Sequence, residues 1–510
     1  MRICIISREY PPETGWGGIG AYSYQLSHEL ARLDNDVHVV CLTKATTSGE
    51  NPEVFLDGKV KVHRVVWGEQ IHLASLINKT QPNTHHLLRA AIPMWKKFLE
   101  LHKVRPFDVV EAPDHLAEGF FIALTRIAPL VVRLHTPFSK LVAEGYHNIK
   151  PDFDSYSVSL IERLAMSQAD LLSSPSVNLA QYVASDTGVE LEQIQIVRNP
   201  VDTKKFSPEG KKANLEIPPN SKIVYFAGRL EGRKGINFLI DAVPDVVKSI
   251  PEAYFVVVGA DTNTGANKSS ILQSLKASLS QKNVLDKVNF VSHVPLNEMP
   301  EYYRLADVCV VPSLFDNAPY TVLEALASGK PVIGSTAGGT PEYIQPGITG
   351  MHVEKANSRA LAAAIIELLK DDSKRHSCGK NARFVAENSY ACSVIASEAL
   401  KTYSLAIERH SRRKDDPIYK HSPENVSKDT IQFIRGYNGL LHTFGEQVSI
   451  RYRSGLSKKL FTTRPKLFSA KVALISAKAA KVLAGQSNSL NGLIKHLEKS
   501  IEQKSPENWD

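Results

Sequence analysis

The chain has 510 residues, of which 43% are apolar and 22% are charged, and its formal net charge is +8. This composition is that of a globular protein of about three domains and excludes a wholly disordered or fibrous chain. Residues 401–510 carry a net charge of +10 and residues 1–400 a net charge of −2, so a nucleic-acid-binding body is not indicated and no nucleic acid is expected as a partner.

The first 200 residues alternate between short β-branched runs and helical patterns. We predict strands at residues 3–7, 37–42, 60–66, 109–111 and 131–135, and helices at 19–33, 87–102, 116–126 and 156–167. Apolar strands separated by helices are typical of parallel βαβ units whose sheet is covered on both faces.

The pattern restarts after a polar, proline-containing stretch at residues 207–220. Strands are predicted at residues 223–227, 254–259, 288–291, 308–312 and 332–335, and helices at 235–249, 269–281, 297–305, 321–328 and 359–370. We therefore predict an α/β fold with two doubly wound parallel-sheet domains, over 1–200 and 201–385. Ligands of such sheets bind at the carboxyl ends of the strands, here in a cleft between the domains. A helix at 386–410 is expected to return toward the first domain.

A glycine loop at residues 15–20 reads G-W-G-G-I-G and matches the dinucleotide-binding fingerprint. Residues 8–14 separate it from the first strand, which makes the connection too long for that motif's tight turn, so we reject a nicotinamide or flavin site. Glycines still let backbone amides approach an anion at a helix start. Gly17 and Gly18 are therefore predicted to contact phosphate, and a flexible turn without a ligand is the alternative.

Two charged pairs follow strands of the second domain. Arg229 and Lys234 lie in G-R-L-E-G-R-K-G, and this combination of a planar fork and a mobile charge suits a diphosphate. Asp316 lies on a loop and Glu324 about one turn into a helix that Pro319 can open, and carboxylates accept hydrogen bonds from sugar hydroxyls. The alternatives are a solvated basic turn for the first pair and helix capping for the second.

Two further candidates lie where predicted strands end. Gly338 and Gly339 form another glycine loop, which is expected to open a helix with Glu342 in its first turn. His135 ends a strand of the first domain in R-L-H-T-P and would face the cleft, although a structural role is the general alternative for a single histidine.

Six motifs in this order resemble the family 4 glycosyltransferases of the GT-B fold, which are retaining and use nucleotide-diphosphate sugars. They are EYPP to GGIG, RLHTP, NPVD, GRLEGRKG, the segment ADVCVVPSLFDNAPYTVLEALASGKPVIGS, and GGTPE, and they cover residues 1 to about 408.

The resemblance implies a role for each candidate. Gly17, Gly18, Gly338 and Gly339 would bind the donor, His135 would touch the transferred sugar, Arg229 and Lys234 would neutralise the diphosphate, Asp316 would contact the donor sugar, and Glu324 would hold the ribose. Two positions depart from the family pattern, which has Glu at the first acid and often Gly at position 319. The Asn-x-Pro-Tyr pattern looks closer to members that build bacterial surface polysaccharides.

The implied activity is that of a hexosyltransferase, with retention of configuration, in polysaccharide or glycolipid synthesis. Its partners would be a nucleotide-sugar donor and a sugar or lipid-linked acceptor. No metal or other cofactor is expected, because fixed cations and amides can stabilise the departing diphosphate. The aspartate pairs at 34–36 and 152–154 are not read as metal sites, because the first precedes a predicted strand and the second lies in a loop that enters a helix. A same-fold sugar-nucleotide isomerase or phosphorylase and a non-catalytic nucleotide-sugar-binding protein are the alternatives. The base, the sugar, the acceptor, the linkage and the oligomeric state do not follow from the sequence.

The last hundred residues, 411–510, form a basic extension that we expect to be helical. Residues 451–490 hold nine Lys and Arg and no Asp or Glu, with an apolar stripe between lysines. Docking on an anionic membrane surface, packing on the catalytic body and binding of an acidic partner are the three interpretations. The apolar stretch before Arg8 is too short for a signal peptide, and the five cysteines form no CxxC pair. We expect a cytoplasmic protein with reduced thiols, peripheral on the inner face of the membrane under the first interpretation.

Overall fold

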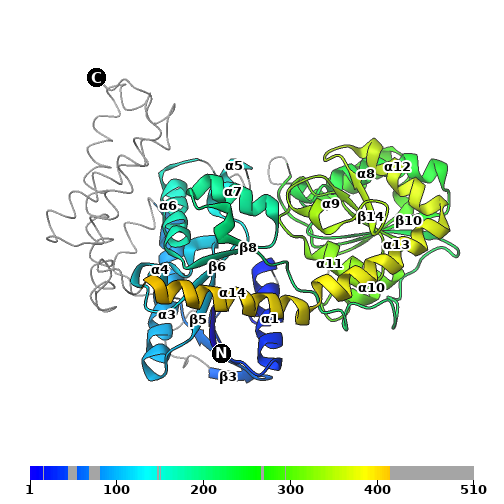
Figure 1. Cartoon of the computed structure of the whole chain (residues 1–510). Coiled ribbons are helices and arrows are strands. Elements are labelled where there is room, and N and C mark those ends of the chain that lie inside the picture. The colour runs from blue at the N-terminus through cyan, green and yellow to red at the C-terminus, as the bar shows by residue number, and fades with distance from the viewer. Residues whose placement is uncertain are drawn as a thin grey trace, which may run out of the picture.

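The computed structural model describes residues 1–14, 17–43, 54–67, 81–145, 149, 151–265, 269–292 and 294–413. The basic extension beyond Arg413, including residues 451–490, lies outside the described residues. Two α/β domains stand side by side in Figure 1, and each is built on its own sheet. No helix in the described part of the chain has the length and apolar character required to cross a membrane.

The first domain has an eight-stranded sheet in the order β3-β4-β2-β1-β5-β6-β7-β8, parallel except where β3 pairs with β4. Its strands are β1 (Arg2–Ile6), β2 (Asp36–Leu42), β3 (Val54–Asp57), β4 (Val60–Val65), β5 (Val109–Pro113), β6 (Leu130–Arg133), β7 (Leu171–Ser174) and β8 (Ile194–Ile196). Its helices are α1 (Gly18–Arg32), α3 (Pro82–Val104), α4 (Phe120–Thr125), α5 (Phe138–Ala143), α6 (Phe153–Gln168) and α7 (Val177–Thr187), with short 3₁₀ turns at His115–Ala117 and Leu191–Gln193.

The second domain has a six-stranded parallel sheet in the order β11-β10-β9-β12-β13-β14. Its strands are β9 (Lys222–Ala227), β10 (Ala253–Val258), β11 (Val288–Val291), β12 (Val308–Val311), β13 (Val332–Ser335) and β14 (Gly350–Val353). Its helices are α8 (Ile236–Ser249), α9 (Ile271–Gln281), α10 (Met299–Leu305), α11 (Tyr320–Ala327), α12 (Ser358–Lys370) and α13 (Asp372–Val385), with 3₁₀ turns at Gly232–Lys234, Leu285–Lys287 and Thr340–Tyr343.

Both sheets are buried on both faces, which explains their continuous apolar strands. Val39 and Val40 are neighbours on β2, and both are fully buried because they belong to separate cores on opposite faces of the sheet. Val224 and Tyr225 of β9 divide in the same way between the two cores of the second domain.

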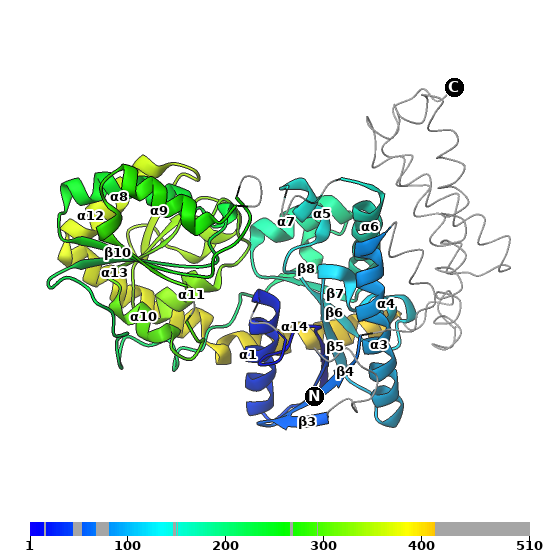
Figure 2. The same ribbon diagram turned by 180° about the vertical axis from the view of Figure 1, so that it is seen from behind.

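The last described helix, α14 (Cys392–Arg413), leaves the second domain and packs on the first. Figures 1 and 2 show it lying across the first domain beside α1. Ala399 and Tyr403 of α14 join the same core as Ile3 of β1. The Tyr403 hydroxyl donates a hydrogen bond of 3.0 Å to the buried Glu111 carboxylate.

Two expected helices differ from the observed ones. The helix expected over 116–126 is interrupted, because Leu116 and Ala117 have φ angles of 56° and 45°, and only Phe120–Thr125 is α-helical. The buried Glu162 carboxylate holds this turn by accepting a hydrogen bond from the Leu116 amide. The helix expected from 386 begins instead at Cys392, because Ala386–Tyr390 forms a π-helical turn and Ala391 is extended.

The loops that follow strands of the two sheets meet between the domains. The Glu342 carboxylate of the second domain accepts hydrogen bonds of 2.8 Å from the amides of Val177 and Asn178, which begin α7 in the first domain. Arg198 donates to the same carboxylate at 2.7 Å. Since the first amides of a helix lack partners within it, a carboxylate from one domain completes a helix of the other.

Candidate functional site

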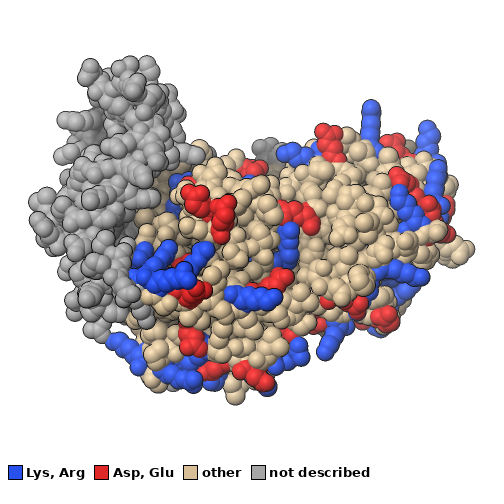
Figure 3. All heavy atoms as spheres, viewed as in Figure 1, with Lys and Arg blue, Asp and Glu red and all other residues tan. Residues whose placement is uncertain are grey.

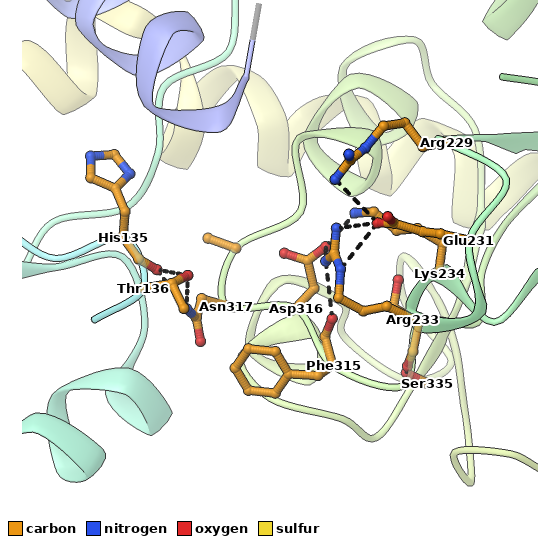
Figure 4. Close-up of polar contacts among 12 residues, drawn as sticks. His135, Thr136, Arg229, Glu231, Arg233, Lys234, Phe315, Asp316, Asn317 and Ser335 are labelled. Carbon is orange, nitrogen blue, oxygen red and sulfur yellow. Dashed lines mark hydrogen bonds and ion pairs between the residues drawn. The ribbon is translucent and has the colours of Figure 1, made fainter. Parts of the chain in front are cut away.

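The basic pair and the first acid lie at the carboxyl edge of the second sheet. β9 and β12 are adjacent and parallel, so the loops that follow them meet. The Lys234 ammonium lies 2.7 Å from Asp316 Oδ2, although the two residues belong to different loops (Figure 4). Gly235 allows this approach, since it has a φ of 69° and a Cβ there would come within 1.9 Å of the Pro312 carbonyl oxygen.

Glu231 holds two arginines beside this pair. Its Oε1 accepts hydrogen bonds from Arg233 at 2.7 and 3.1 Å and from Arg229 at 3.3 Å. The Glu231 side chain is 5% exposed, whereas that of Arg229 is 56% exposed. The buried Glu231 carboxylate therefore orients the Arg229 guanidinium, which remains accessible from solvent. Neither Glu231 nor Arg233 is among the site residues predicted from the sequence, although both lie within the octapeptide G-R-L-E-G-R-K-G.

The Asp316 carboxylate is ionised at neutral pH. Its burial alone would raise the pKa, but the charges of Lys234 and of Arg233, which lies at 3.7 Å, outweigh burial and hold the pKa of Asp316 below its usual value. The cluster thus contains three cations (Arg229, Arg233 and Lys234) and two carboxylates (Glu231 and Asp316). An anion placed between Arg229 and Lys234 would meet a net positive charge.

Glu324 lies on α11 and is held by a different partner. The Tyr303 hydroxyl of α10 donates a hydrogen bond of 2.7 Å to its Oε2. Burial raises the pKa of Glu324 to about 7, although the hydrogen bond from Tyr303 opposes this rise. The two members of the acidic pair therefore have opposite pKa shifts and separate surroundings.

His135 follows β6 in the first domain, and its backbone carbonyl, rather than its ring, lies toward Asn317 of the second domain (Figure 4). Its amide donates a hydrogen bond of 2.8 Å to the buried Asp114, and its ring packs edge-on against Tyr22 at 5.3 Å. Burial, followed by the charge of Arg133, lowers the pKa of His135 well below its usual value. The imidazole is neutral at pH 7 and can exchange hydrogen bonds with a hydroxyl group, but it provides no positive charge for a diphosphate.

The glycine loops occupy two different settings. Gly17 and Gly18 are exposed at the start of α1, while Gly15 and Trp16 lie outside the described residues. Gly338 and Gly339 instead press on the loop that holds Asp316, and the Gly339 amide donates to the Asp316 carbonyl oxygen at 2.8 Å. As expected, this second loop opens a helix with Glu342 in its first turn, although the helix is only the short 3₁₀ segment Thr340–Tyr343 with Gly339 as its N-cap. Glu342 in that turn serves α7 of the other domain.

The aspartate pairs have other partners. Asp36 pairs with Lys61 at 2.6 Å, Asp152 caps α6 through the Ser155 amide at 2.9 Å, and Asp154 accepts hydrogen bonds from Asn83 and Thr84. Over the described residues, no three His, Cys, Asp or Glu side chains are grouped as a metal ion would require.

Sequence comparisons cover both domains. The family described as "Glycosyltransferase Family 4" matches residues 16–205, and the family "Glycosyl transferases group 1" matches residues 208–384. A D-inositol 3-phosphate glycosyltransferase of Corynebacterium aurimucosum is 27% identical over 81% of this chain and 99% of its own length. A glycogen synthase of Mycobacterium tuberculosis is 26% identical over 83% of this chain and 99% of its own.

Solved structures share the architecture. Sucrose-phosphate synthase from Thermosynechococcus elongatus has a TM-score of 0.64 at 23% identity, covering 79% of this chain and 98% of its own. The Anabaena protein HepE, solved in complex with UDP-glucose, has a TM-score of 0.57 at 18% identity, covering 79% of this chain and 99% of its own. The predicted GT-B arrangement of two parallel-sheet α/β domains is thereby confirmed.

Proposed function

Since the chain belongs to the family 4 glycosyltransferases and is an enzyme that transfers glycosyl groups, we propose that its donor is a nucleotide-diphosphate sugar and that the product retains the anomeric configuration. In this reaction the bond between the anomeric carbon and the diphosphate breaks, and its electron pair leaves with the diphosphate. The acceptor oxygen forms the new glycosidic bond, and its proton passes to a phosphate oxygen of the departing diphosphate.

The observation that carries this proposal is the cluster of Arg229, Arg233 and Lys234 opposite His135. The Arg229 guanidinium is oriented by Glu231 and largely exposed, and the Lys234 ammonium is held by Asp316. Both would bind the diphosphate and stabilise the negative charge that grows on it as the bond breaks, without reorganisation at that moment. Exposed amides of Gly17 and Gly18 at the start of α1 would approach the same anion from the first domain.

The remaining residues have roles toward the sugar and the nucleoside. The neutral His135 would exchange a hydrogen bond with a hydroxyl of the transferred sugar, Asp316 would accept one from the same sugar, and Glu324 would accept from the ribose. HepE was solved with UDP and with UDP-glucose, and a plant starch synthase with ADP, which supports a nucleotide-sugar donor. We further propose a role in polysaccharide or glycolipid synthesis, because the sequence around Asn317 resembles that of such members.

The test is a panel of UDP-, ADP-, GDP- and TDP-linked hexoses, each incubated with sugar, phosphosugar and lipid-linked acceptors in the presence of excess EDTA. We expect release of nucleoside diphosphate that depends on the acceptor, survives EDTA, and yields a product whose anomeric configuration by NMR matches the donor's. Inverted product would refute retention, and activity restored only by Mg²⁺ or Mn²⁺ would refute metal independence. Acceptor-independent conversion of the donor would favour the same-fold isomerase or phosphorylase.

We also propose that residues 451–490 dock on an anionic membrane surface, where a lipid-linked acceptor would be presented. The support is their charge, nine basic residues and no acidic one. Each Lys or Arg near such a surface contributes about 1 kcal/mol of attraction.

A further inference from the structure

Asn317 of the second domain contacts the turn that contains His135 in the first. Its side chain is 5% exposed, and its Nδ2 lies 2.5 Å from the His135 carbonyl oxygen and 2.8 Å from Thr136 Oγ1 (Figure 4). These contacts join residues that are more than 180 positions apart and lie on opposite sides of the domain boundary.

The hydrogen-bond donors and acceptors of the turn determine which end of the Asn317 side-chain amide faces it. The His135 carbonyl oxygen can only accept hydrogen bonds. The Thr136 hydroxyl donates its hydrogen to that same oxygen at 2.5 Å, so the hydroxyl oxygen can act only as an acceptor toward Asn317. Both acceptors therefore need N–H groups, and the amide of Asn317 supplies two. Its Oδ1 is buried and has no hydrogen-bond partner among the described residues.

The turn is thus held from both domains. On its own side, Asp114 accepts from the His135 amide at 2.8 Å, and the His115 ring lies 3.2 Å from the Thr136 carbonyl oxygen. The His135 carbonyl oxygen accepts from the Thr136 hydroxyl within the turn and from Asn317, which is the contact that the second domain supplies. When the domains separate, the hydrogen bonds from Asn317 to the turn at His135 and Thr136 are lost.

We propose that Asn317 is a positioning residue that places His135 for glycosyl transfer only when the two domains are closed. This inference rests on the proposed role of His135 toward the donor sugar. Closure itself is held elsewhere, by Glu342 on α7 and by the Tyr343 hydroxyl, which donates to the Pro175 carbonyl oxygen at 2.7 Å. Removing the Asn317 side chain should therefore loosen the turn without opening the molecule.

The kinetic test compares Asn317→Ala and the nearly isosteric Asn317→Asp with Asn381→Ala. Asn381 donates at 3.3 Å to Ile348 within the second domain, so its variant makes the same chemical change away from the boundary. We expect both Asn317 variants to lower kcat by about 10- to 100-fold, because small misplacements of reacting groups carry such costs. The KM for the donor and the Kd for its nucleoside diphosphate should stay within about twofold, and Asn381→Ala should match the wild type. Equal kcat for the three variants, or a loss of nucleotide affinity that parallels the loss of kcat, would overturn the proposal.

A second readout does not depend on activity. Hydrogen–deuterium exchange followed by mass spectrometry should show faster exchange, by about tenfold, in peptides covering residues 134–138 of Asn317→Ala, with the remainder unchanged. Unchanged exchange in this turn would refute the positioning contact even in an active enzyme. Faster exchange in a protein that turns over no donor would instead keep the contact and refute the proposed function.

Discussion

Lys234 and Asp316 form an ion pair of 2.7 Å, and this single contact joins the two motifs on which the proposed donor site depends. Asp316 is one methylene shorter than the Glu that the family has at this position. Asp316 accepts a hydrogen bond from Lys234, and the charge of Lys234 is the main cause that lowers the pKa of Asp316. A diphosphate would therefore compete with Asp316 for the ammonium group.

Removing either proposed diphosphate contact should impair catalysis while leaving the fold intact. We expect Arg229→Ala and Lys234→Ala each to lower kcat/KM by about 100-fold, since loss of one preorganised charge donor costs about 3 kcal/mol. Steady-state kinetics with the active donor measures the effect, and circular dichroism checks the fold. Arg359→Ala, an exposed arginine on α12, is the matched control. Near-normal activity of both site variants would contradict the site assignment.

Glu324 predicts how nucleotide binding depends on pH. The pKa of Glu324 is raised to about 7 by burial, so its carboxylate is available to ribose hydroxyls above that pH and becomes protonated below it. The affinity for nucleoside diphosphate should fall below pH 7 by up to about tenfold per pH unit. Isothermal titration calorimetry between about pH 5.5 and about pH 8.5 measures this dependence.

The variants Glu324→Gln and Asp316→Asn separate the two acids. Glu324→Gln should bind nucleoside diphosphate weakly at every pH, with only the ligand's own titration remaining. Asp316→Asn should bind it at least as tightly as the wild type, because the diphosphate lacks the sugar and no longer competes with a carboxylate for Lys234, and it should lose turnover of the complete donor. Equal losses of nucleotide affinity in both variants would refute this division of roles.

At the scale of elements, α7 depends on a residue of the other domain. Glu342→Gln removes the charge that faces the Val177 and Asn178 amides and Arg198. Charge interactions at a helix N-terminus contribute about 0.3–2 kcal/mol, so the closed arrangement should lose that much stability. Small-angle X-ray scattering should give a larger radius of gyration for Glu342→Gln than for the wild type. Glu298→Gln, at an exposed carboxylate of the same domain, should leave the radius unchanged.

Local sequence patterns were sufficient to predict the strands and helices whose own residues carry a clear apolar pattern. The runs that became β10, β12 and β13 are buried throughout and that of β9 is buried except at its two ends, so the continuous apolar run alone was sufficient to predict each strand. β7 and α7 were not predicted, because β7 (Leu171–Ser174) is short and ends in two serines. Ser176, whose hydroxyl accepts from the Leu179 amide as an N-cap, was the available signal for α7.

The site was only partly visible in the sequence, because its contacts cross between loops and between domains. The motif letters selected Arg229, Lys234, Asp316 and His135, which the structure gathers around one boundary. They did not select Asn317 or the link between Glu342 and α7, since both depend on how two separately folded sheets meet. The opposite pKa shifts of Asp316 and Glu324 also depend on partners, Lys234 and Tyr303, that lie far from them in the chain.

At the scale of the whole molecule, charge is divided unequally between the body and its extension. Acidic and basic side chains are interspersed on the face of both domains seen in Figure 3, consistent with the near-zero net charge of residues 1–400. The basic extension, residues 411–510, would therefore supply the attraction to an anionic surface.

Vesicle sedimentation tests the membrane proposal. The full chain should sediment with vesicles of about one-third phosphatidylserine at low salt and be released as salt screens the surface charge. There are two controls. A chain ending at residue 413 should not sediment with the anionic vesicles, and the full chain should not sediment with vesicles of phosphatidylcholine alone. A full chain that remains in the supernatant with anionic vesicles at low salt would refute the proposal.

The packing of α14 has a consequence for biosynthesis. The core beneath β1 and β2 is closed by Ala396, Ala399, Tyr403 and Ala406, so the first domain to leave the ribosome is completed by the last described segment. While the second domain emerges, this face of the nascent first sheet is covered only in part, by α1, and leaves apolar surface that a chaperone can bind. The second domain, whose two cores contain no residue of the first sheet, can fold before the first is finished.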